Sequence, residues 1–184
     1  VLPLNPLGNQ GSTLPALLTS PAGGRHVVHG HVVAAALAGV PLTAAVALGT
    51  GYLAGSSPLV LAALGVGSVV AVVGSAVVAT GIGSAFPRFD AVAFDGSRRA
   101  VPPSKRAYGL FSTVLSLVVL AGVFAADGTA RVVGSALLSQ WLPFGVEVSA
   151  GTLEPLSWIV LGCGVAGVGA AYRLAVRRLE TYQL

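Results

Sequence analysis

The chain has 184 residues, of which 54% are hydrophobic and 9% are charged, and its formal net charge is +4. Soluble domains carry about 25% charged residues. Because residues 27–87 contain no Asp, Glu, Lys or Arg, a water-soluble globule is excluded. Disordered chains are rich in charge and poor in apolar residues, so disorder is excluded as well. The composition indicates an integral membrane protein, and since the basic residues do not gather on one solvated face, no nucleic-acid partner is expected.

Four stretches reach the length of about 20 mostly apolar residues that a helix needs to cross the hydrocarbon core. The predicted spans are residues 32–53, 59–79, 107–126 and 156–175. These runs do not alternate apolar and polar residues as barrel strands do. The expected fold class is therefore all-α, a polytopic membrane protein with a cytoplasmic segment over residues 1–26 and a transmembrane domain over residues 27–184.

Small residues dominate the predicted spans. Pairs of small residues spaced four apart let two helix backbones approach closely. The chain offers Gly51/Gly55, Gly67/Ala71 and Gly162/Ala166, although chance pairing in a chain rich in Gly and Ala is an equal alternative for any one of them. Pro41 should kink the first span unless a neighbour satisfies the carbonyl that it frees.

The basic residues predict the orientation, because short cytoplasmic loops retain Lys and Arg. Nine basic residues fall on one side of the four spans and one, Arg131, falls on the other. The nine are Arg25, Arg88, Arg98, Arg99, Lys105, Arg106, Arg173, Arg177 and Arg178. Both chain ends are therefore expected in the cytoplasm.

Residues 127–154 on the opposite side are too apolar for a plain loop. Residues 132–146 form an apolar run of about 15 residues, a length typical of re-entrant or interfacial segments. The run contains Trp141, Pro143 and Phe144. We expect an external re-entrant segment of two short helices that meet near Pro143, with a loosely packed loop as the alternative.

Two cytoplasmic pieces complete the organisation. A helix is expected from Ser12 or Thr13 to a stop at Pro21, with Leu14, Leu17 and Leu18 on one face. This helix would lie on the inner membrane surface. The cytoplasmic loop, residues 86–106, is expected to contain one or two helical turns.

No motif predicts an active site. Residues 162–167 satisfy G-x-G-x-x-G, but they lie within a span, without a preceding strand or a following acidic residue, so helix packing is the favoured reading. His26, His29 and His31 lack a nearby carboxylate or thiolate, which favours polar anchoring at the interface over metal binding. We expect no catalytic residues, no cofactor and no metal, and the single cysteine, Cys163, is expected to be a small buried packing residue.

Residues 10–21, Gln-Gly-Ser-Thr-Leu-Pro-Ala-Leu-Leu-Thr-Ser-Pro, followed by Arg25 and Gly30-His31, resemble the E-x-G-T-L-E-x-L-L-x-x-P … G-K pattern of ABC-2 type transporter permeases. In that family the pattern forms a cytoplasmic coupling helix between spans two and three. The loop residues 85–91 and 100–104 are similar to haloarchaeal members. Gln10 or Asn9, Pro15 and His31 stand where the family has charged residues.

The resemblance implies a C-terminal portion that contains spans three to six, and the opening Val1-Leu2-Pro3 without a Met agrees with a fragment that lacks spans one and two. It implies the permease subunit of an ATP-driven exporter in the cell membrane. Expected partners are the lipid bilayer, a separate ABC ATPase and a second permease copy or related half. The implied ATPase-coupling residues are Gly11, Thr13, Leu14, Leu17, Leu18 and Pro21, and the implied external gate is Trp141, Pro143 and Phe144.

Two other functions stay open from the sequence. The first alternative is a membrane-embedded scaffold or assembly protein without transport activity, whose N-terminal helix would only lie on lipid. An intramembrane enzyme is the second. No span presents a polar cluster that would identify a transported substrate.

The nine-to-one distribution of basic residues predicts that the loop of residues 86–106 faces the cytoplasm. A cysteine placed at position 97 should resist an impermeant thiol reagent added to intact cells and should react after the membrane is opened. Labelling of position 97 from outside intact cells would contradict the predicted orientation.

Overall fold

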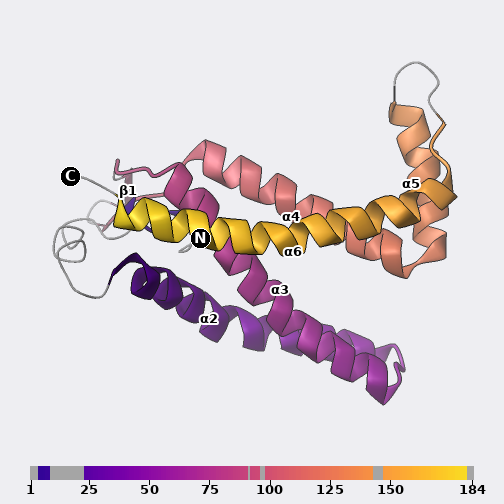
Figure 1. Cartoon of the computed structure of the whole chain (residues 1–184). Coiled ribbons are helices and arrows are strands. Elements are labelled where there is room, and N and C mark those ends of the chain that lie inside the picture. The colour runs from indigo at the N-terminus through magenta and orange to yellow at the C-terminus, as the bar shows by residue number, and fades with distance from the viewer. Residues whose placement is uncertain (1–3, 9–22, 91, 96–97, 143–146, 182–184) are drawn as a thin grey trace. The chain divides into compact units, whose positions relative to one another are not determined.

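The computed structural model describes residues 4–8, 23–90, 92–95, 98–142 and 147–181 (Figure 1). Its long helices are α2 (Gly23–Leu53), α3 (Pro58–Ala85), α4 (Lys105–Ala126) and α6 (Ala150–Glu180), and a shorter helix, α5 (Gly128–Trp141), precedes α6. The chain divides into two compact units, one of residues 1–111 and 168–184 and the other of residues 112–167.

The four long helices are each long and apolar enough to cross a membrane. The expected helical fold with four long apolar helices that could span a membrane is therefore confirmed. The helices extend beyond the predicted spans, since α2 begins at Gly23 rather than at residue 32 and α6 runs from Ala150 to Glu180 rather than over residues 156–175. A helix can continue past the hydrocarbon with polar residues, whereas the apolar pattern marks only the part inside it.

A tight turn joins α2 and α3 into a helical hairpin (Figure 1). Gly55 has φ +70°, a conformation that glycine adopts without steric cost. Ser57 caps α3 by accepting a hydrogen bond at Oγ from the Val60 N–H (3.5 Å), and Pro58 occupies the first helical turn, where its missing N–H costs nothing. Before this turn α2 runs through Pro41 as one element of 31 residues.

The close helix contacts agree only in part with those that the small-residue pairs predict. Gly51 packs against α3, since a Cβ there would lie 2.7 Å from the Leu64 side chain, whereas Gly55 lies in the turn and Gly67 and Gly162 face open space. Cys163, expected to be a buried packing residue, is exposed. A close crossing also joins α3 to α6, where a Cβ on Gly81 would lie 2.7 Å from both the Cβ and the carbonyl oxygen of Ala171. Spacing along one helix cannot identify such a contact, because the contact depends on which face meets a second helix.

The loop between α3 and α4 contains a β-hairpin rather than the expected helical turns. Strand β1 (Val92–Asp95) pairs antiparallel with β2 (Arg98–Ala100), with Val92 opposite Ala100. The sequence Asp95-Gly96 is a strong signal for a tight hairpin connection. Beyond β2, Ser104 Oγ accepts a hydrogen bond from the Ala107 N–H (3.1 Å), so α4 begins at a capped end.

Between α4 and α6 the described residues form one helix, α5, and not two. Residues 147–149 are not helical, and α6 begins directly after them at Ala150. Pro143, near which two helices were expected to meet, lies outside the described residues. At 1.5 Å per residue α5 is about 21 Å long, shorter than the hydrocarbon core of about 30 Å.

The Gly81 contact predicts a position-specific effect on stability. Gly81→Val should lower the free energy of unfolding by about 1–3 kcal/mol, because the added side chain overlaps the α6 backbone. Gly67→Val, on the same helix but facing open space, is the matched control and should change stability little. Thermal unfolding of both variants in one detergent measures the difference, and equal losses would contradict the crossing.

Candidate functional site

The start of α2 and the end of α6 pack together in the first unit. A Cβ on Gly24 would lie 3.0 Å from the Leu179 Cβ and from the Val176 carbonyl oxygen. This contact belongs to a buried apolar cluster, here called the terminal cluster, formed by Leu7, Val28, Ala175, Val176 and Leu179. Its side chains bring three separate parts of the sequence to one end of the unit.

A buried asparagine joins the N-terminal segment to the loop between α3 and α4. The Asn5 side chain is 1% exposed, donates from Nδ2 to the carbonyl of Arg88 (2.8 Å), and accepts at Oδ1 from the N–H groups of Arg88 (3.2 Å) and Gly8 (3.3 Å). Leu4 lies directly over Gly83 near the end of α3. Residues 4–8 therefore belong to the helical unit rather than standing apart from it.

His29 and Tyr172 form a polar contact between α2 and α6. The Tyr172 hydroxyl lies 3.1 Å from His29 Nε2, and the two rings stack at 5.8 Å between centroids with an interplanar angle of 20°. His31 Nδ1 lies 2.9 Å from the carbonyl oxygen of Val27 in its own helix. Among the described residues no three His, Cys, Asp or Glu side chains are placed to share a metal ion. His29 and His31 thus serve contacts between and within helices, and Tyr172 is a partner that the sequence analysis missed.

An open pocket of about 200 Å³ lies beside this contact. Its lining residues are Arg25, Tyr172, Arg173, Val176, Arg177 and Glu180. Within the described parts of the chain no carboxylate lies in ion-pair distance of any of the three arginines. The dipole of α2 is positive and that of α6 is negative at this end, so the two oppose each other and the charge of the pocket comes from its side chains. The pocket is therefore electropositive despite Glu180.

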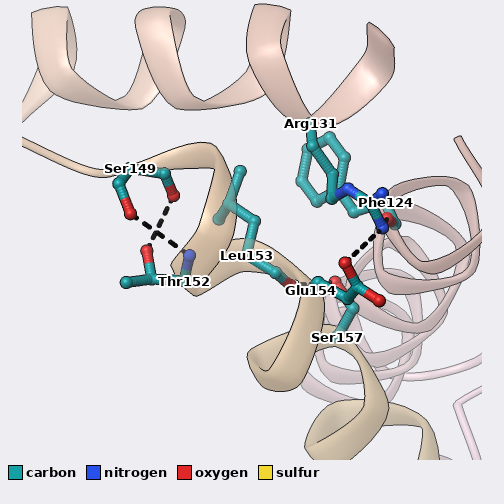
Figure 2. A network of polar contacts seen from close by, with 7 residues as sticks. All are labelled: Phe124, Arg131, Ser149, Thr152, Leu153, Glu154 and Ser157. Atoms are coloured by element: carbon teal, nitrogen blue, oxygen red, sulfur yellow. Dashed lines mark hydrogen bonds and ion pairs between the residues drawn. The ribbon is translucent and has the colours of Figure 1, made fainter. Parts of the chain in front are cut away.

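The second unit contains a different polar network, centred on Arg131 (Figure 2). Its guanidinium donates to the carbonyl of Phe124 in the last turn of α4 (3.2 Å) and pairs with Glu154 in the first turns of α6 (3.1 Å). Asp127 caps α5 by accepting from the Ala130 N–H (2.7 Å). Because Arg131 contacts both α4 and α6, the end of α4 and the start of α6 lie at the same end of this unit.

Two further contacts hold α5 in this corner. A Cβ on Gly134 would lie 2.6 Å from the Phe124 ring, and Ser139 Oγ accepts a hydrogen bond from the Val148 N–H (2.9 Å). Figure 2 also shows Ser149 and Thr152 bonded to each other at the start of α6. These contacts hold α5 against the end of α4 and the start of α6. The opposite charges of Arg131 and Glu154 in a segment poor in charge were the available sequence signal for this network.

The sequence-predicted site residues are only partly described. Trp141, the last residue of α5, is 84% exposed, and Pro143 and Phe144 of the expected gate lie outside the described residues. The expected coupling residues also lie outside them. These are Gly11, Thr13, Leu14, Leu17, Leu18 and Pro21.

No protein-family model, no curated protein and no solved structure matches the chain.

The Arg131 network predicts unequal effects for its two charged partners. Arg131→Ala should destabilise the protein more than Glu154→Ala, since only the arginine also donates to the Phe124 carbonyl. A double-mutant cycle should give a coupling of about 0.2–1 kcal/mol, because Glu154 is half-exposed. Glu147→Ala, which removes an exposed charge from the same segment, is the control. A coupling of zero with equal single effects would contradict the pair.

Proposed function

We propose that the chain is the membrane-spanning subunit of an ATP-driven exporter of the ABC-2 permease type in the cell membrane. The proposal depends on the resemblance of residues 10–21 to the family's coupling-helix pattern. A separate ATPase subunit binds and hydrolyses ATP, since the chain contains no P-loop motif. The permease converts the movement of that partner into export.

The observation that carries the proposal is the position of the residues on either side of the coupling-like segment. Leu7, before it, and Val28, after it, lie in the same terminal cluster. Asn5 is bonded to the loop that follows α3, and Arg25, Arg88 and Arg173 also belong to this end of the unit. The described residues on both sides of the segment thus lie at the basic end of the unit, the end that the positive-inside bias predicts to face the cytoplasm.

An attachment of this kind suits force transmission. Before the segment, Asn5 bonds to the α3–α4 loop and Leu7 packs in the terminal cluster with residues of α6; after it, Val28 of α2 lies in the same cluster. A push from a cytoplasmic ATPase on the segment would therefore act on α2 and α6 through the terminal cluster and on the end of α3 through the bond of Asn5 to Arg88. ATP can drive the change only if the ATPase contacts differ between the inward- and outward-open states.

The second unit supplies the gate in this proposal. Trp141 at the end of α5 is exposed, as suits an aromatic residue at headgroup level. The family resemblance assigns Trp141, Pro143 and Phe144 to the external gate. A second permease copy, or a related half, completes the translocation pathway.

A substitution in the coupling-like segment tests this function. Leu17→Asp with Leu18→Asp should abolish co-purification of a P-loop ATPase with the tagged full chain from native membranes, and should abolish the associated ATP hydrolysis. The reason is that both side chains belong to the apolar face expected to dock on the ATPase. Membrane insertion should be unchanged.

The matched control is Ala16→Asp, which the helical period places on the opposite face and which should retain the ATPase. If the double variant retains the ATPase, the coupling role is wrong. If the unaltered chain co-purifies with no ATP-hydrolysing protein, the chain is better described as a scaffold without transport activity.

A further inference from the structure

We propose that the pocket between α2 and α6 binds the phosphate-bearing headgroup of an anionic phospholipid. The inference is independent of the exporter function, since it needs only a membrane protein with this pocket at the end of its spans. Its evidence is the charge of the lining, the lack of internal neutralisation and the order of side chains along α2.

The pocket has the donors that a phosphate diester requires. Arg25 approaches from α2, and Arg173 and Arg177, which are four residues apart and so adjacent on the helix surface, approach from α6. Guanidinium groups match phosphate oxygens with two parallel hydrogen bonds. Glu180 supplies the single negative charge of the lining, so three positive charges face one.

These guanidinium groups are available to a ligand. The ion pair in the described parts of the chain joins Arg131 to Glu154 in the other unit, and Arg25, Arg173 and Arg177 have exposed side chains without a carboxylate in ion-pair distance. The volume of about 200 Å³ is several times the share of one water molecule, about 30 Å³, and thus accommodates a phosphate group with part of its hydration.

The side chains along α2 favour a lipid over a free phosphate ion. Arg25, His29, Val33 and Leu37 follow one another at intervals of four, so each is the surface neighbour of the next. The stripe changes from a guanidinium through an imidazole to two aliphatic side chains, which are 55% and 74% exposed. A phospholipid presents the same order, from phosphate through the ester region to the acyl chain. Basic pockets between spanning helices at the cytoplasmic face are known to bind such headgroups.

The test titrates the purified full chain in a neutral detergent with phosphatidylglycerol, with phosphatidylcholine or with inorganic phosphate, and measures bound ligand by native mass spectrometry. We expect one tightly held phosphatidylglycerol, whose affinity falls as the salt concentration rises, and no comparable phosphatidylcholine. Equal binding of the two lipids would overturn the proposal. So would binding of inorganic phosphate that displaces the lipid at equal concentration, because the pocket would then be a free-anion site.

The variants locate the site. Arg173→Gln with Arg177→Gln should weaken phosphatidylglycerol binding about thirtyfold, because each arginine near an anionic lipid contributes about fivefold. Arg106→Gln with Arg178→Gln removes the same charge from exposed residues outside the pocket and should leave binding nearly unchanged. Arg25→Gln, on the other helix, should cost about fivefold and keeps the test valid if the double variant fails to fold. Equal losses in the pocket variant and its control would overturn the pocket as the site.

Discussion

A peptide group in hydrocarbon has no water to bond, and this constraint shapes the whole chain. Helices satisfy it within one segment, and the four long helices follow from it. The hydroxyl side chains obey the same rule, because Ser68, Thr80 and Ser157 donate to carbonyl oxygens one turn earlier in their own helices. Among the described residues no buried side-chain polar atom lacks a partner.

Helix association in such an environment needs close packing, since lipid tails are as apolar as the side chains they replace. The structure meets this need at glycines that lie against a second helix. Gly81 admits the backbone of Ala171, Gly39 admits Val72, and Gly134 admits the ring of Phe124. Gly51 in the same way lies against Leu64, whereas Gly67 and Gly162 face open space.

The charged residues lie at the ends of the long helices and in the segments between them. Their roles differ between the two units. Arg131 in the second unit is neutralised by Glu154 and bound to the α4 carbonyl of Phe124, so it stabilises a corner of the fold. Arg25 and Arg173 in the first unit are left exposed around a pocket. The paired Arg131 stabilises the fold. The exposed arginines beside the apolar surface of α2 suit the phosphate and the acyl chain of the proposed anionic phospholipid.

The sequence by itself determined the number of spans, their approximate limits and the gathering of basic residues outside them, because apolar length and charge position are properties read along one dimension. It also contained Asp95-Gly96, a dipeptide typical of hairpin turns, although helical turns were expected in the surrounding loop. Only the tertiary structure decided which glycine meets which helix, that Asn5 bonds to Arg88 across 83 residues, and that His29 meets Tyr172 across 143. These contacts depend on how helix faces turn toward one another, and the periodicity of a single helix does not encode its partner.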